Sequence, residues 1–158
     1  MAQSPNQFKQ SVILGMLDLR FNSETLSCEV VSTYSGDAMV PGQAVKLSDV
    51  GGGIPKVEAC TADSDEVFGF INYDIKNKSF VAGDKLEVSR ESNVMYLHAA
   101  EPISRGAQVC LYLADGDGYV ANLLDGKRIV GYALDKATAE GDLIRVVLST
   151  PSFSVYSA

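Results

Sequence analysis

One short pattern recurs along this chain and limits what it can fold into: a glycine followed by residues that alternate between polar and apolar. It occurs four times, at residues 42–47, 83–88, 106–111 and 141–146. Glycine readily adopts the positive φ that a tight turn needs, and a period of two places every second side chain on the same face of a strand. Each copy therefore predicts a tight turn that leads into a half-buried β-strand.

Two longer segments of the chain are also similar to each other in sequence. Residues 67–74, with the sequence VFGFINYD, resemble residues 129–135, with the sequence IVGYALD, and a Gly-Asp strand start follows each. A glycine inside a strand marks a bulge, a sharp bend or the close approach of another backbone. The two bent strands predict a small closed barrel with approximate internal duplication.

The spacing of turns fixes the expected fold class. From about residue 40 onward, short apolar runs are bounded by turn residues at roughly 8–12-residue intervals, which is typical of all-β sandwiches and barrels. We therefore expect an all-β fold, a small β-barrel or sandwich with short strands and at most one short helix, over residues 135–139. The Asp125-Gly126 pair predicts a type I′ hairpin between residues 120–124 and 129–133.

The first forty residues differ from the rest. We expect residues 1–38 to form an extended N-terminal arm with a strand-like apolar segment, residues 39–150 a β-domain, and residues 151–158 a C-terminal tail. Burial of the apolar side chains in the arm's segment 11–21 contributes a favourable free energy. This nearly equals the conformational entropy cost of ordering the segment. Two outcomes stay open for it: strand addition to a partner surface, or the first strand of its own barrel.

Charge and hydropathy narrow the class of partner. The net charge of −7 repels phosphate backbones, so we expect no nucleic acid partner. The apolar stretch at residues 12–17 is short and is followed by Asp18 and Arg20, which fits neither a signal peptide nor a membrane span. We expect no membrane partner, and synthesis in a cytosol-like compartment.

Two loops contain residue types that bind ions, but in the wrong pattern. The glycine-rich loop at residues 51–56 lacks the spacing of a phosphate-binding P-loop. The DGDG sequence at residues 115–118 lacks the further ligands of a calcium-binding EF-hand loop, so a hairpin turn is favoured. We expect neither a metal ion nor a cofactor.

Nucleophilic catalysis finds no support in the sequence either. The single histidine, His98, sits at a strand end and no G-x-S-x-G motif accompanies it. Cys28, Cys60 and Cys110 have no metal-type spacing, and we expect all three to be small buried hydrophobes. The expectation is a protein that is not an enzyme, with no catalytic residue and no small-molecule substrate.

Several stretches, in their order along the chain, resemble the bacteriophage head decoration, or capsid cement, proteins. They are GQAVKL, GGGIPKV, ADSDEVFGFINYDIKNKSFVAGDKLEVSR, NVMYLHAAEPISRGAQVCLY and RIVGYALDKATAEGDLIRVVLSTPSF. The resemblance covers roughly two-thirds of the chain. Its most telling part is the order of the strands: a G-F/Y strand, an A-G-D strand, an I-x-x-G-A strand, then a second G-Y strand and a closing G-D strand.

The resemblance implies a non-enzymatic virion protein on the outer capsid surface, made in the host cytoplasm. Its implied partners are the major capsid protein, which it bridges to stabilise the expanded head, and further copies of itself in a homotrimer. The expected contacts are the apolar residues of the arm, Phe8, Val12, Ile13, Leu14, Met16, Leu17, Leu19 and Phe21. Two alternatives stay open: a carbohydrate-binding or adhesin-like β-domain of a virion, and a small carboxylate hydrolase.

Overall fold

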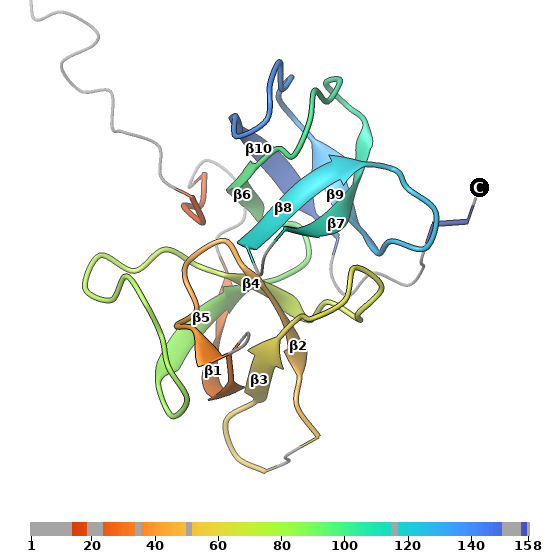
Figure 1. Cartoon of the computed structure of the whole chain (residues 1–158). Helices are drawn as coiled ribbons and strands as arrows, with labels where there is room; N and C mark the ends of the chain where they lie inside the picture. Colours follow the sequence, from red (N-terminus) through yellow and green to blue (C-terminus); the bar gives the residue numbers. More distant parts are fainter. Residues whose placement is uncertain are drawn as a thin grey trace, which may run out of the picture.

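The structure is a computed structural model that describes residues 14–18, 24–33, 36–49, 52–114, 117–149 and 156–157. Ten β-strands form two groups of five, which lie one above the other in Figure 1. The described ranges contain no α-helix, and hence none with the length and apolar character of a membrane span. The expected all-β class is confirmed.

The first five strands close into a barrel in the order β1-β3-β2-β4-β5, which we call the first unit. Their bounds are β1 Thr25–Ser32, β2 Ala44–Leu47, β3 Lys56–Ala59, β4 Gly69–Ile71 and β5 Lys85–Ser89. Closure depends on β1, which pairs antiparallel with β5 on one side and parallel with β3 on the other. Thus the stretch Thr25–Ser32 of the predicted arm is a barrel strand. The interior is packed with Cys28, Val30, Met39, Val45, Val57, Ala59, Ile71, Phe80, Leu86 and Val88.

The other five strands form a sheet in the order β6-β10-β9-β7-β8, which we call the second unit. Their bounds are β6 Val94–His98, β7 Gln108–Ala114, β8 Asp117–Asn122, β9 Ile129–Ala133 and β10 Leu143–Leu148. A parallel bridge joins Ala99, just past β6, to Val120 of β8, and the Ala100 N–H donates to the Val120 carbonyl at 2.9 Å. The two edges of this sheet therefore meet, as in a barrel.

Both units share one topology, which confirms the internal duplication. Within each unit the first strand lies parallel to the third, and the remaining neighbours are antiparallel in the same order. Loop contacts repeat too: the Met39–Phe80 bridge of the first unit matches the Ile103–Ala137 bridge of the second. The sequence echo was expected within one barrel, but each copy forms its own five-stranded unit.

Two strand glycines hold equivalent positions in these units. A Cβ atom on Gly69 of β4 would lie 2.6 Å from the Ser89 carbonyl oxygen, and one on Gly131 of β9 would lie 2.0 Å from that of Val147. Both distances are far below van der Waals contact, so the neighbouring strand can pass only where no side chain is present. The predicted close backbone approach is confirmed in both copies.

Turn chemistry was predicted well, but two local assignments were wrong. The four glycines that start the repeated pattern, Gly42, Gly83, Gly106 and Gly141, all have positive φ. The Asp125-Gly126 turn, however, joins strands that do not pair, because β7 lies between β8 and β9 in the sheet. Residues 135–139 are not helical, because Ala137 instead exchanges backbone hydrogen bonds with Ile103.

The two units share a core. Four residues on the outer side of the barrel, Ala44, Cys60, Val67 and Phe70, belong to the same buried cluster as the interior of the second unit. We call these four the first-unit wall. Polar contacts surround this junction: Lys127 Nζ lies 2.6 Å from Asp63 Oδ2, and the Arg128 side chain donates to the carbonyls of Ser64 and Asp65.

Candidate binding surface

The predicted contact segment lies against its own chain where the structure describes it. Three expected contact residues, Leu14, Met16 and Leu17, fall within residues 14–18; the other five, Phe8, Val12, Ile13, Leu19 and Phe21, lie outside the described residues. Leu17 is 8% exposed and belongs to the core of the second unit. Residues 14–18 of this segment pair with β6 of the same chain, in the second unit.

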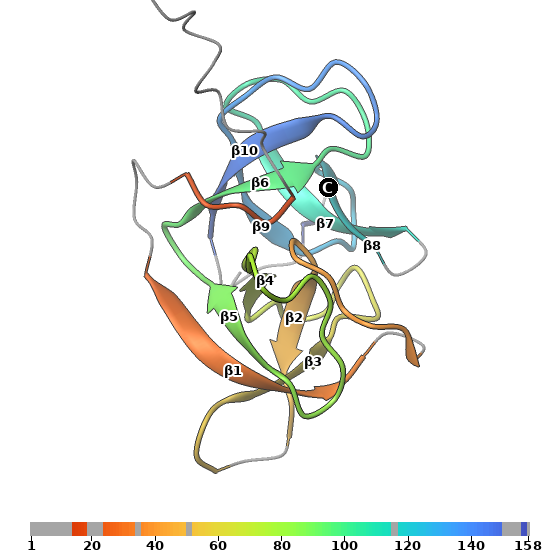
Figure 2. The same ribbon diagram turned by 90° about the vertical axis from the view of Figure 1, so that its left-hand side faces the viewer.

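Backbone hydrogen bonds join this segment, which we call the added strand, to Val94–Tyr96 of β6, ahead of the point where Ala99 meets β8; Figure 2 shows the segment in red beside β6. The N–H of Gly15 donates to Tyr96, that of Tyr96 to Met16 and that of Asp18 to Val94, at 2.8 to 2.9 Å. The Gly15 carbonyl also accepts a hydrogen bond from Tyr73, in the loop after β4. The segment therefore holds the two units together and covers an edge that could otherwise pair with another chain.

An ion-pair network fixes the end of the added strand. Asp18 is 6% exposed, and its carboxylate accepts a hydrogen bond from Arg145 Nη1 at 3.2 Å. Arg145 also makes a bidentate contact to Asp135, with Nε and Nη2 donating at 2.9 and 2.8 Å. Bidentate contacts between guanidinium and carboxylate are strong and directional. One arginine of β10 thus anchors the strand through a carboxylate that is almost fully buried.

These pairs predict how stability depends on pH. Hydrogen bonds from Arg145 hold the pKa of Asp135 below its usual 3.8. Burial alone would raise the pKa of Asp65, but hydrogen bonds from the backbone of Thr61 and Ala62 and from Lys46 lower it. A depressed pKa in the folded state adds stability that is present above the unfolded value and is lost as the pH falls through the folded value.

We therefore expect the free energy of unfolding to be level near neutral pH and to fall below about pH 4. Urea unfolding at pH 7 and at pH 3 measures the difference. The variant Asp135→Asn should be less stable at pH 7 and should lose less stability between the two pH values. An equal loss in the variant and the original chain would contradict the assignment to Asp135.

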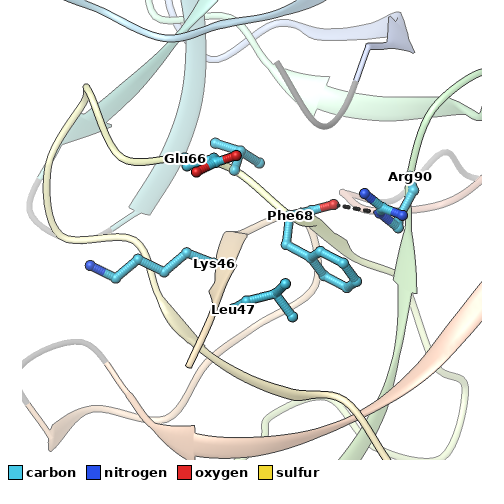
Figure 3. A pocket seen from close by; sticks show the side chains of 6 residues that line it. Lys46, Leu47, Glu66, Phe68 and Arg90 are labelled. Atoms are coloured by element: carbon cyan, nitrogen blue, oxygen red, sulfur yellow. Dashed lines mark hydrogen bonds between the residues drawn. The ribbon is translucent and has the colours of Figure 1, made fainter. Parts of the chain in front are cut away.

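An open pocket lies at one end of the barrel (Figure 3). Its volume is about 290 Å³, and its lining residues are Lys46, Leu47, Glu66, Val67, Phe68 and Arg90. Leu47 ends β2, Phe68 precedes β4 and Arg90 follows β5, so these three residues surround the barrel opening. We call them the first-unit rim. Leu47 is 53% exposed, which leaves a large apolar side chain in water.

Phe68 makes two contacts with Arg90 within this rim. Its guanidinium carbon lies 4.2 Å from the centre of the Phe68 ring, and its Nε donates to the Phe68 carbonyl at 2.9 Å. Lys46, by contrast, is engaged by Asp65 at 3.2 Å and by Glu58 at 3.8 Å. A fixed, partly apolar surface with an aromatic ring and a stacked arginine is typical of protein–protein contacts.

The thiols are placed for packing and not for chemistry. Cys28, Cys60 and Cys110 are each at most 2% exposed and unpaired, as the sequence predicted. Burial raises the pKa of Cys28 to about 11 and that of Cys60 to about 12, and it also raises the pKa of Cys110. All three are protonated at neutral pH and are weak nucleophiles there. Among the described residues, no three His, Cys, Asp or Glu side chains come close enough to hold a metal ion.

No local sequence signal marks the rim. Leu47 and Phe68 lie in runs whose pattern predicts strands, where an apolar residue is normally buried. Arg90 follows such a run and looks like an ordinary surface residue. Nothing local shows that the three meet, because strand pairing over more than forty residues brings them together.

Comparison with known proteins gives a likeness in fold. No protein-family model matches the chain, and no curated protein matches it in sequence. Among solved structures, the N base of the head fiber protein gp8.5 of bacteriophage phi29 is similar, with a TM-score of 0.52 and 19% sequence identity. The match covers 82% of this chain and 95% of that one. The likeness therefore extends over both units.

Proposed function

We propose that this chain is a non-enzymatic virion structural protein that binds the outer surface of a bacteriophage head and stabilises the expanded shell by bridging neighbouring major capsid proteins. The observation that carries the proposal is the likeness of both units to the base of a phage head fiber. The order of strand motifs that resembles the decoration proteins supports the same role. A phage capsid surface is the setting in which these two independent similarities agree.

The physical properties of the chain suit adhesion to a shell. Two packed cores and a covered sheet edge give a stiff body that does not need a partner to bury its apolar residues. The net charge of −7 opposes non-specific aggregation of the protein before assembly. Exposed apolar side chains such as Leu47 at 53% and Val81 at 52% leave contact area available.

A trimeric arrangement would strengthen such attachment. Three linked copies bind with effective concentrations that reach the millimolar range for short connections, so weak single contacts add up to a stable complex. A three-fold unit also fits the local three-fold points of an icosahedral shell. Light scattering on free and head-bound protein tests this part of the proposal, and a strict monomer in both states would contradict it.

Co-sedimentation with phage heads tests the function itself. Purified protein is added to undecorated expanded heads and to unexpanded heads of the same phage, and both are pelleted. We expect stoichiometric uptake by the expanded heads and a higher temperature of head disruption after uptake. Protein that was unfolded by heat beforehand is the control for non-specific pelleting. Failure of expanded heads from the producing phage to retain the folded protein would reject the proposal.

A further inference from the structure

The internal duplication allows the two units to be compared residue by residue. The strand glycines and the strand pairings align β2 with β7, β4 with β9 and β5 with β10. On this alignment the first-unit rim, Leu47, Phe68 and Arg90, corresponds to Leu111, Val130 and Leu148. We call these three the second-unit rim. All three are at most 1% exposed and belong to the cluster that contains the first-unit wall.

The rims therefore differ in what covers them. The second-unit rim is buried in the cluster that also contains the first-unit wall, whereas the first-unit rim lies open around a pocket of about 290 Å³. The same strand arrangement thus has a covered opening in one copy and an uncovered opening in the other. Leu47 is 53% exposed, while its counterpart Leu111 is fully buried.

The first-unit wall also has a counterpart in the second unit. The first-unit wall, Ala44, Cys60, Val67 and Phe70, corresponds to Gln108, Leu123, Ile129 and Tyr132, which we call the second-unit wall. The alignment is secure at its largest side chain, because Phe70 pairs with Ala44 and Ser89, and Tyr132 pairs with Gln108 and Val147. Phe70 is 1% exposed, but Tyr132 is 47% exposed.

We propose that the first-unit rim of one copy binds the second-unit wall of another copy, in a head-to-tail contact that repeats the internal junction between the units. The occupant is a second copy of this chain because it carries the face that the duplicated fold already packs against this opening. Arg90, fixed over Phe68 at 4.2 Å, would meet Tyr132, an aromatic ring on which guanidinium groups stack favourably. Such contacts close into a ring where the rotation permits, and otherwise form a filament.

Charge makes the contact between copies weaker than the internal junction. Inside the chain, Lys127 and Arg128 meet the loop at residues 63–65. At the corresponding positions the first unit has Asp65 and Glu66, so an arriving copy meets carboxylates instead of cations. Salt screens this repulsion, so we expect association to be concentration-dependent and to increase with ionic strength.

Sedimentation velocity on free protein, with no heads present, tests the proposal. Leu47→Glu should disable the rim and Tyr132→Glu the wall, and each variant alone should be monomeric where the original chain associates. Each variant keeps the face that the other lacks. An equimolar mixture of the two should therefore form a complex of two chains, joined through the one intact rim and the one intact wall.

Ile75→Glu is the matched control, because Ile75 is 80% exposed and lies beside Lys85 and Leu86, at the opposite end of β5 from Arg90. It should associate like the original chain, and circular dichroism confirms that all variants are folded. A monomer at every concentration and salt level would overturn the proposal. So would association of both single variants, or a mixture that stays monomeric. Head binding is measured separately, so failure here leaves the capsid proposal standing.

Discussion

Among the glycines that the structure describes, Gly131 is the one whose replacement by alanine is expected to lower stability the most. The new Cβ would lie 2.0 Å from the Val147 carbonyl oxygen and 3.0 Å from its carbonyl carbon. Neither atom belongs to a flexible side chain, so β9 and β10 would have to separate. We expect a loss of about 3 kcal/mol in the free energy of unfolding, which corresponds to roughly 6–12 °C in Tm.

Gly106→Ala separates this steric effect from backbone strain. Gly106 has a φ of +84°, but an added Cβ would meet no atom within 4 Å. An alanine there must adopt the left-handed backbone conformation, which lowers the free energy of unfolding by about 1 kcal/mol. Chemical denaturation of both variants gives the comparison, and a Gly131→Ala loss no larger than that of Gly106→Ala would contradict the packing of β9 on β10.

Arg145→Met should detach the added strand. Methionine keeps most of the side-chain volume but leaves the carboxylate of Asp18, 6% exposed, with its charge buried and this ion pair broken. Breaking a buried ion pair from one side costs about 3 kcal/mol. The change should also speed hydrogen exchange at the amides of Gly15 and Asp18, which donate to β6.

A second ion pair provides the control. Lys56 Nζ lies 3.6 Å from Glu29 Oε2, and both side chains are more exposed than Asp18. Lys56→Met should therefore cost less than about 1 kcal/mol and leave exchange at Gly15 and Asp18 unchanged. Equal losses in the two variants would show that Arg145 does not anchor the strand in the way described.

The positions of many strands could be predicted because they depend on short stretches of sequence. A turn glycine followed by period-two alternation located β2, β5, β7 and β10, since both signals depend on neighbours within a few residues. The strand glycines Gly69 and Gly131 were likewise recognised as points of close backbone approach. Even the duplication was visible as an echo between the sequences around them.

Pairing between strands could not be predicted in the same way. The Asp125-Gly126 turn is real, yet β9 pairs with β7 and β10, because the barrel-like order of the unit decides which edges are available. The rim was missed for the same reason: Leu47, Phe68 and Arg90 meet only when three strands come together. The apolar segment at residues 14–18 gave no sign that its partner was β6, whose sequence lies far downstream.

The added strand also sets an order of events during protein synthesis. Leu17 bridges to Met95, and Asp18 contacts Arg145, so residues 14–18 leave the ribosome well before the residues that they bind. The barrel strands all lie between these points and can fold while translation continues. The nascent chain must therefore carry this apolar segment without its partners until β6 and β10 have emerged. A truncated product that ends before β10 would keep that segment exposed, and we expect chaperones and proteases to act on it there.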